Sequence, residues 1–203
     1  MIILHKVEKS ELSKSAVVLA EAFQDDPLWN KILVDGADKS RKHPIVAEIL
    51  LRYCYKYGEV YASSKDLEGV MAITQDKKSY MNLWGLLRSG AIVPFMSLGG
   101  KSLAKMSHAF TPLDKARYKE MKGRPFMYLQ VIGVSKDNQG KGYGRQLLQG
   151  LIEKSHQAKI PVYLETETEL NVSIYEKLGF KTVEKMMLPV INQPMWTMIR
   201  EPA

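Results

Sequence analysis

The stretch from residue 125 to residue 158 constrains the fold more than any other part of the chain. It begins with the nearly continuous apolar run PFMYLQVIGVS, continues through a polar loop with three glycines, and ends in a leucine-rich segment. A continuous apolar run is typical of a strand buried on both faces. Apolar residues then recur at helical spacing, at Leu147, Leu148, Leu151 and Ile152. The stretch therefore predicts a buried strand, a glycine loop and a helix that ends at about Ala158.

The glycine loop has the composition of a phosphate-binding site. Gly140, Gly142 and Gly144 allow successive backbone N–H groups to converge on a pyrophosphate without side-chain obstruction. The N-terminus of the following helix adds partial positive charge, and Lys141 and Arg145 supply cationic donors. The loop indicates a phosphate site, although a simple strand-to-helix turn would use the same glycines.

Two widespread phosphate-binding motifs do not match this loop. A Walker A loop ends in Gly-Lys-Ser/Thr, and GKGYG lacks the hydroxyl residue that holds magnesium. In the dinucleotide fingerprint counted from Gly140, Arg145 occupies the place of the third glycine. Five residues also separate the strand from Gly140, whereas the Rossmann turn is tight. The sequence thus excludes a Walker loop and argues against a dinucleotide cofactor.

The remaining segments predict a mixed α/β fold without internal repeats. Before the buried strand we expect a strand at residues 2–7, a helix at about 10–23 with Ser10 as its N-cap, and a short helix that begins at Pro27. The run RKHPIVAEILLRYCYKYG predicts a helix that ends at Gly58, and EVYAS and LEGVMAIT predict a hairpin. After it we expect the strand PVYLETE, the helix NVSIYEKLG with Asn171 at or near its N-cap and Gly179 at its end, and the strands FKTVEKMML and QPMWTMIRE.

Residues 76–124 differ from their surroundings because they are rich in methionine and aromatic side chains. Glycine and proline divide this region into several segments that we expect to be helical. Most of the large side chains are expected in the helical core, and others could line an adaptable apolar pocket or a protein interface. We therefore expect one domain over residues 1–203, with a helical insertion at about 76–124.

Composition restricts the classes of partner. The net charge is +7, but basic residues are spread along the chain and interleaved with acidic ones, which argues against nucleic-acid binding and suits a small polyanionic ligand. No apolar run is long enough to span a membrane, and the N-terminus becomes charged too soon for a secretory leader. The single cysteine, Cys54, reads as a buried structural thiol and is compatible with the reducing cytosol. We expect a cytoplasmic protein with no membrane or nucleic-acid partner.

The four histidines, at positions 5, 43, 108 and 156, show no ligand spacing, so we predict no metal site. As a separate point, exposed methionine and aromatic residues could support a homodimer. Neither expectation bears on the phosphate loop, which remains the strongest indication of function.

The loop and the segments that follow it resemble the GCN5-related N-acetyltransferase (GNAT) family. The family pattern Gln/Arg-x-x-Gly-x-Gly/Ala appears as Gln139-Gly140-Lys141-Gly142-Tyr143-Gly144. The asparagine, tyrosine and Gly-Phe of its later motif appear as Asn171, Tyr175, Gly179 and Phe180. The resemblance is specific over about residues 126–185. It extends more loosely to small-molecule acetyltransferases of the puromycin acetyltransferase type, which also place extra helices before the central strand.

This resemblance implies the GNAT fold, a mixed α/β sheet, with acetyl-CoA bound between the strands that contain VIGV and YLETE. It implies that Ile132, Gly133 and Val134 pair with the pantetheine through backbone groups. The Val134 N–H would face the thioester carbonyl and stabilise the oxyanion that forms there. Asn171 would orient the pantetheine or the start of its helix. The pyrophosphate would be held by the loop residues Gln139, Gly140, Lys141, Gly142, Tyr143, Gly144 and Arg145.

Acetyl transfer to an amine also requires a general acid and a general base. Tyr175 lies where the family places its acid, and a phenol with a pKa of about 10 is protonated at neutral pH, although a tyrosine packed in the core would look the same. Strand alternation places Tyr163, Glu165 and Glu167 on one face. We predict that Glu165 contributes to a water-relayed base; it could also bind a cationic acceptor or be a solvated strand end.

Taken together, these residues predict an acetyl-CoA-dependent N-acetyltransferase that acts on the amine of a small molecule by direct attack in a ternary complex. The helical insertion would shape the acceptor pocket. Two alternatives remain open: acetylation of a peptide or protein amine, and a catalytically silent CoA-binding module. Nucleic-acid binding ranks below all three.

Overall fold

The computed structural model describes residues 2–33 and 39–202, and within them seven strands form one mixed sheet. The strand order is β1-β2-β3-β4-β5-β7-β6. The neighbours β4 and β5 are parallel, and the other neighbours are antiparallel. The strands are β1 (His5–Lys6), β2 (Glu59–Ala62), β3 (Gly69–Gln75), β4 (Met127–Val134), β5 (Val162–Thr166), β6 (Lys181–Leu188) and β7 (Gln193–Arg200).

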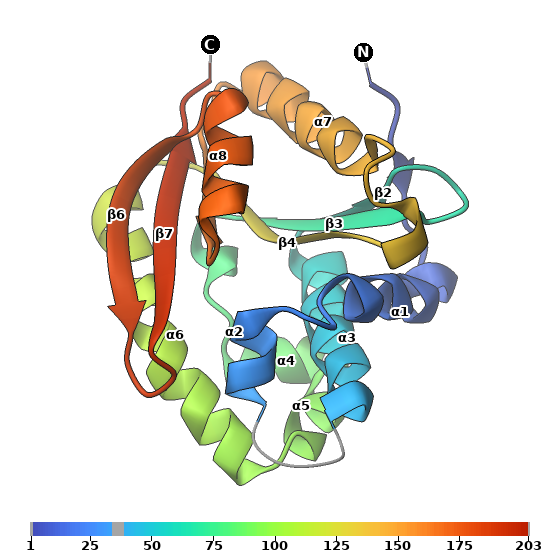
Figure 1. Ribbon diagram of the computed structural model, residues 1–203, viewed down its shortest axis with the longest axis vertical. Coiled ribbons are helices and arrows are strands. Elements are labelled where there is room, and N and C mark those ends of the chain that lie inside the picture. The colour runs from blue at the N-terminus through green and yellow to red at the C-terminus, as the bar shows by residue number, and fades with distance from the viewer. Residues whose placement is uncertain (1, 34–38, 203) are drawn as a thin grey trace.

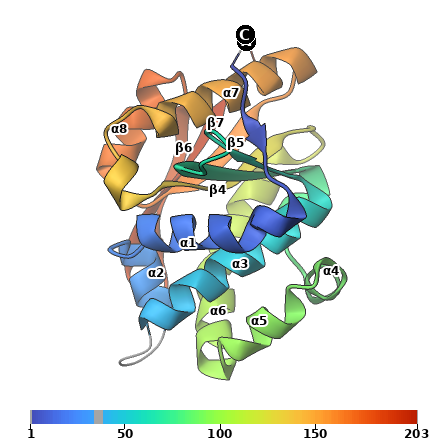
Figure 2. The same cartoon turned by 90° about the vertical axis from the view of Figure 1, so that its right-hand side faces the viewer.

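Helices cover both faces of this sheet, as Figure 2 shows. On one face lie α7 (Tyr143–Ala158) and α8 (Glu169–Lys177), and on the other lie α1 (Leu12–Ala22) and α3 (Lys39–Tyr57). The helices expected between residues 76 and 124 are α4 (Leu83–Ser89), α5 (Ile92–Ser97) and α6 (Gly100–Met121). Together with α2 (Pro27–Ile32), they extend the layer that contains α3 (Figure 1). None of the described helices is long and apolar enough to cross a membrane.

Apolar clusters hold these layers together, and three of them fix the helices named above. Leu19, Leu51 and Val70 belong to the core between the sheet and α1 and α3. Leu147, Leu151 and Leu164 belong to the core under α7. A third cluster joins α3 to the inserted helices through Tyr53, Leu86 and Leu98, all buried. The insertion is therefore fixed to α3 by packing. Cys54 is fully buried in the first of these cores, as its helical spacing predicted.

Two predicted element starts are wrong in detail. The first strand is limited to β1, and α1 is preceded by a 3-10 turn, η1 (Lys9–Glu11), whose N-cap is Glu8 rather than Ser10. The Glu8 N–H donates to the Glu11 carboxylate at 2.8 Å, and the Glu8 side chain accepts from the Glu11 backbone. This reciprocal capping box satisfies two helix-end donors at once. The reciprocal pair therefore moves the start of the helical segment to Glu8.

The ends predicted at Pro27, Gly58 and Gly179 are confirmed. Pro27 is the first residue of α2, and the Asp26 carboxylate caps that helix by accepting from the Trp29 N–H at 2.8 Å. Gly58 follows α3, where a Cβ atom would lie 2.0 Å from the Ile73 carbonyl oxygen. Gly179 follows the C-cap of α8 with φ of +86°. Glycine at this last position avoids the strain of left-handed backbone.

Strand β4 contains an irregularity at its centre and pairs with β5 along only part of its length. Ala72 of β3 faces Val131 and Ile73 faces Leu129, so Gln130 is an extra residue, a β-bulge. On its other edge β4 pairs with β5 at Met127–Val162 and Tyr128–Tyr163. Beyond Tyr128 the two strands separate, and no described residue pairs with that edge of β4. A gap between two neighbouring parallel strands results.

Candidate active site

Backbone N–H groups at the end of β4 point into the gap between β4 and β5. The Ser135 N–H donates to the Glu68 carbonyl at 2.9 Å, so it points toward β3. Since backbone groups alternate along a strand, the N–H groups of Ile132 and Val134 point the other way, into the gap. The N–H of Gly133 points toward β3. The expected pairing through Gly133 is therefore not available, because its backbone groups face Val70.

Gly133 has a different role, which is steric. A Cβ atom at this position would lie 2.8 Å from the Cβ of Ala22 and 3.0 Å from Leu19 Cδ2. Both contacts come from α1, which passes directly over β4. Glycine here lets α1 approach the strand whose end forms the gap.

The glycine loop lies beside this gap, as its contacts with Val134 indicate. The Gln139 side-chain amide donates to the Val134 carbonyl at 3.3 Å. Gly140 and Gly142 adopt φ of +78° and +90°, which favours glycine, and a Cβ atom on either would meet nothing within 4 Å. Gly144 is helical, and a Cβ there would make an ordinary 3.6 Å contact with Val134. Two of the three glycines are thus required by the backbone, and the space in front of them is open.

The backbone N–H groups of this loop are available to a ligand. Gln139 N–H donates to the Lys136 carbonyl at 3.4 Å. Within the described part of the chain, the N–H groups of residues 140–145 have no acceptor, and the first bond of α7 is Gln146 N–H to Gly142 C=O at 3.0 Å. Free amides at the N-terminus of a 16-residue helix form an anion-binding site. Lys141 and Arg145 are exposed around it, as is Gln139, whereas Tyr143 is half-buried at the start of α7.

Asn171 and Tyr175 lie on α8, next to the gap. Asn171 is not the N-cap, because Thr168 caps the helix with its hydroxyl, which accepts the Asn171 N–H at 3.2 Å. The Asn171 side chain is left to line a cavity together with Tyr175. Tyr175 is 9% exposed and packs edge-on against Phe180, with ring centroids 5.5 Å apart. Burial, then the nearby Glu167, raises the pKa of Tyr175, so its phenol stays protonated at neutral pH.

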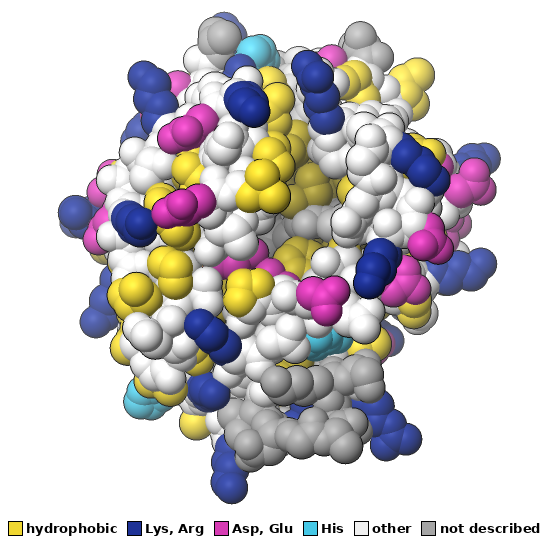
Figure 3. Space-filling view, viewed as in Figure 1, with side chains coloured by type: hydrophobic (Ala, Val, Ile, Leu, Met, Phe, Trp, Pro, Cys, Tyr) yellow, Lys and Arg dark blue, Asp and Glu magenta, His cyan; other side chains and the backbone are white. Residues whose placement is uncertain are grey.

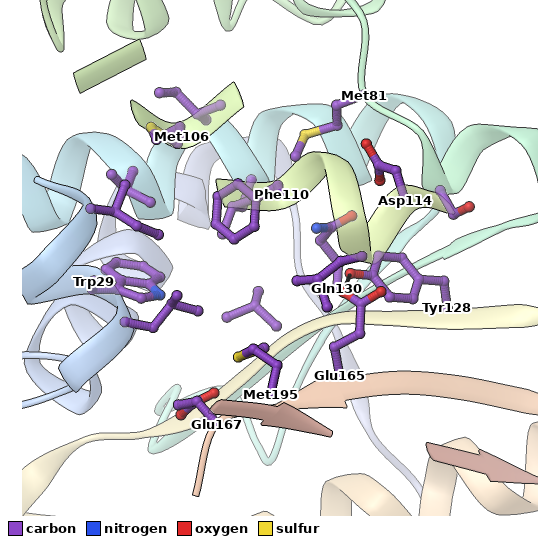
Figure 4. A pocket seen from close by; sticks show the side chains of 18 of the residues that line it. Trp29, Met81, Met106, Phe110, Asp114, Tyr128, Gln130, Glu165, Glu167 and Met195 are labelled. Carbon is purple, nitrogen blue, oxygen red and sulfur yellow. Dashed lines mark hydrogen bonds between the residues drawn. The ribbon is translucent and has the colours of Figure 1, made fainter. Parts of the chain in front are cut away.

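The cavity that reaches Tyr175 and Ile132 has a volume of about 580 Å³. Figure 3 shows a hollow at the centre of one face, with hydrophobic and acidic side chains inside it. Its walls come from the sheet and from the helices that extend the α3 layer, including α6 of the insertion. Much of the lining is apolar, as Figure 4 shows for Trp29, Met81, Met106, Phe110 and Met195. Such walls suit a compact organic ligand.

Glu165 lies in this cavity, but its oxygens are engaged. Its carboxylate pairs with Arg117 at 2.8 Å and accepts from the Tyr128 hydroxyl at 2.7 Å. Arg117 is 2% exposed and its guanidinium lies 4.2 Å from the Tyr128 ring centroid. Burial raises the pKa of Glu165 although Arg117 opposes the shift. Arg117 therefore holds this carboxylate in place.

Glu167 occupies a different environment two residues farther along the chain. It lines the cavity just beyond the end of β5, apart from Glu165, with Met195 between the two (Figure 4). The carboxyl group of Asp26, at the start of α2, lies against it. Burial first, and then Asp26, raises the pKa of Glu167 to about 8. Glu167 can therefore exchange a proton near neutral pH.

The structure thus adds Arg117, Asp26 and Glu167 to the residues selected from sequence. Strand alternation had placed Glu167 on the same face as Glu165, and this was the available signal for it. No local pattern distinguished Arg117 on α6 or Asp26, because the partners of both residues come from distant parts of the chain. Among the described residues, no cluster of three or more His, Cys, Asp or Glu side chains could hold a metal ion.

Comparisons with known proteins agree with this geometry. Residues 109–182 match the family described as acetyltransferase (GNAT) domain. The matched range covers part of α6, the strands that border the gap, the glycine loop and Tyr175. The family match therefore falls on the elements that form the candidate site.

Similarity also extends over nearly the whole chain. An uncharacterized N-acetyltransferase from Schizosaccharomyces pombe is 28% identical over 97% of this chain and 82% of its own length. The structure of a histone acetyltransferase HPA2 and related acetyltransferase from Corynebacterium glutamicum superposes with a TM-score of 0.71 at 20% identity, covering 98% of this chain and 96% of that one. The polyamine N-acetyltransferase of Drosophila melanogaster, which forms N-acetylagmatine, gives 0.65 at 12% identity, covering 98% and 99%. At these identities the solved structures show a shared fold.

Proposed function

We propose that the chain belongs to the GNAT superfamily of N-acetyltransferases and that it transfers an acetyl group from acetyl-CoA to the amine of a small molecule. Membership implies an acyl-CoA donor; the acetyl group and the kind of acceptor are our proposal. The observation that carries it is the gap between β4 and β5, which has free amides beside it and an apolar cavity of about 580 Å³ next to it. The Drosophila enzyme of this fold acts on a small amine.

The donor would bind along the gap. The free N–H groups of residues 140–145, with Lys141 and Arg145 around them, suit the diphosphate. The N–H groups of Ile132 and Val134, which point into the gap, suit the pantetheine arm in the manner of an added strand. The Val134 N–H would then stabilise the oxyanion that forms on the thioester carbonyl, and one such donor is typically worth about 3–4 kcal/mol.

The reaction needs two proton transfers, and two residues of the cavity suit them. As the amine nitrogen bonds to the acyl carbon, its proton passes to the Glu167 carboxylate. As the carbon–sulfur bond breaks, the Tyr175 hydroxyl protonates the departing thiolate. Glu165, held by Arg117, would contribute by positioning a water molecule or the acceptor. This assignment moves the proton acceptor from Glu165 to Glu167, because Glu167 has no cationic partner among the described residues.

Binding and turnover test this proposal in sequence. Calorimetry should detect acetyl-CoA binding, and Gly142→Glu should weaken it at least tenfold, because a carboxylate would occupy the phosphate site. Gly99→Glu is the matched control, since Gly99 also has a positive φ and open space around it but lies before α6. No detectable binding of acetyl-CoA to the wild-type protein would refute the proposal.

An amine panel that includes a short peptide then identifies the class of acceptor, with free-thiol release as the readout. Tyr175→Phe should lower kcat by about 10²- to 10⁴-fold, the usual contribution of a general acid, while the affinity for acetyl-CoA changes little. Tyr118→Phe on the exposed surface of α6 is the control. Unchanged turnover in Tyr175→Phe would remove Tyr175 from the mechanism, and exclusive acetylation of the peptide would overturn the small-molecule assignment.

A further inference from the structure

The cavity has a second polar end, distinct from the end at Tyr175. Figure 4 shows Asp114, Gln130 and Glu165 grouped at one side and Glu167 at another, with Met195 between them. Asp114 comes from α6, Gln130 from the bulge of β4, and Glu165 from β5. Three elements therefore converge on a site that contains neither of the two proposed proton-transfer residues, Tyr175 and Glu167.

This end of the cavity has more anionic than cationic groups. Arg117 is its one cation among the described lining residues, and it pairs with both Glu165 and Asp114. One guanidinium thus faces two carboxylates, which leaves a net charge of −1 when both are ionised. Burial raises the pKa of Asp114 and of Glu165 although Arg117 opposes it in each case. A further cation would be stabilised here.

The terminal nitrogens of Arg117 are already engaged. Its two terminal nitrogens bind Glu165, Asp114 and, at 3.4 Å, the Ser79 carbonyl. The rings of Tyr80 and Tyr128 lie 4.8 Å and 4.2 Å from its guanidinium carbon. The side chain is 3% exposed and cannot move to serve another anion without breaking these contacts. Additional positive charge must come from outside the cluster.

Three polar atoms at the same end lack partners. The Gln130 side-chain oxygen, the Ser79 hydroxyl oxygen and Arg117 Nε are buried and make no hydrogen bond to any described residue, and all three residues line the cavity. Ser79 is 2% exposed. Buried polar atoms are nearly always hydrogen-bonded in native proteins, so the two oxygens point to a ligand with N–H donors. A water molecule could satisfy one of them but would not supply charge.

We infer that the acceptor is a bifunctional amine, whose second cationic group, an ammonium or a guanidinium, binds between Asp114, Glu165 and Gln130. This rests on the proposed function, which puts the amine to be acetylated beside Glu167 and Tyr175. An apolar chain or ring between the two groups would pack against Phe110, Trp29 and Met195. A diamine or an amino-guanidine with such a body meets both ends at once.

Matched amines test this inference. We would compare alkyl monoamines from butyl to octyl with the corresponding α,ω-diamines, following free-thiol release. A charge-assisted contact of this kind should make kcat/KM for the best diamine about tenfold or more higher than for the monoamine of equal length. Asp114→Asn and Gln130→Met should each reduce that preference severalfold, mainly through KM. Asp114 suits mutation because its side chain is 52% exposed and its loss should not prevent folding.

Glu120→Gln is the matched control, because it removes a carboxylate from the same helix α6 outside the cavity lining. If monoamines are acetylated as well as diamines, or if the preference survives in both Asp114→Asn and Gln130→Met, the inference is wrong while the proposed function stands. If no amine in the panel releases thiol, the proposed function itself fails. The two failures are therefore distinct.

Discussion

Glu165 on β5 and Glu167 just beyond its end both line the cavity, but they differ in their nearest charged neighbour. Glu165 faces the guanidinium of Arg117, whereas Glu167 faces the carboxyl group of Asp26. A neighbouring cation favours the ionised form, and a neighbouring anion favours the protonated form. Environments that separate two acids in this way commonly mark different roles in a site. The proton acceptor assigned here follows from that difference.

The pH dependence of the rate distinguishes the two acids. A general base acts in its deprotonated form, so kcat/KM should rise with pH and level off above about 8, the pKa of Glu167. In Glu167→Gln this rise should disappear and the rate should fall about 10²-fold or more. Asp26 and Tyr175 also face Glu167, so the pH profile is measured in Tyr175→Phe as well. Titration of the acceptor amine is subtracted from each profile.

Glu165→Gln is the companion variant in this experiment. Its rate should fall less, and the rise with pH should persist, because Glu167 remains in place. Loss of the pH dependence in Glu165→Gln alone would instead identify Glu165 as the base, as the sequence predicted.

At the scale of elements, the position of α1 and the shape of β4 depend on each other. The bulge at Gln130 and the loss of pairing beyond Tyr128 expose the end of β4. Gly133 allows α1 to pack directly on this end, since it leaves room for Ala22 and Leu19. The end of β4 therefore borders the gap along one edge, and α1 packs on one face of the same stretch.

Substitution of Gly133 should disturb this packing. In Gly133→Ala the new methyl group would lie 2.8 Å from the Ala22 Cβ, a contact that neither rigid backbone can relieve without moving. Overpacking of this kind costs about 1–3 kcal/mol of the free energy of unfolding. Urea denaturation measures it. Gly100→Ala is the control, because nothing lies within 4 Å of its Cβ position at the start of α6; equal stability of the two variants would contradict the proposed contact.

At the scale of the whole molecule, the cavity places ionisable groups where water is scarce. Glu167 illustrates the consequence for stability. Its pKa is raised from 4.5 to about 8 in the folded protein, so the native state binds its proton more tightly than the unfolded chain does. The resulting stabilisation is complete below the unfolded pKa and is lost as pH rises through about 8. The fold should therefore become less stable over this range on account of this one group.

Glu167→Gln should abolish this pH-dependent loss of folding stability. Because glutamine does not ionise, the variant should gain stability relative to the wild type as pH rises from 4.5 toward 8, by at most about 1.4 kcal/mol per pH unit. Thermal unfolding at several pH values measures the difference. Glu176→Gln, on the exposed side of α8, is the control. Curves for Glu167→Gln and wild type that stay parallel across this range would contradict the raised pKa.

Local sequence patterns predicted the elements well but their ends less well. Helical spacing and glycine punctuation located α3, α7 and α8, and the apolar run located β4. Ser10 was wrong as a cap, and Asn171, expected at or near the cap of α8, lies three residues after it, because Glu8 and Thr168 have the capping side chains. Such competition is decided by geometry within one turn, and residue preference alone does not resolve it.

The sequence by itself determined the mixed α/β fold, the glycine loop and the resemblance to the GNAT family, because these depend on local periodicity, backbone freedom and a short motif. Only the tertiary structure decided the order in which β7 enters the sheet between β5 and β6, and the bulge that opens the gap. It alone brought Arg117 to Glu165 and Asp26 to Glu167. Charge and burial at these positions arise from segments distant in the chain, so the chemistry of the cavity is a property of the packed molecule.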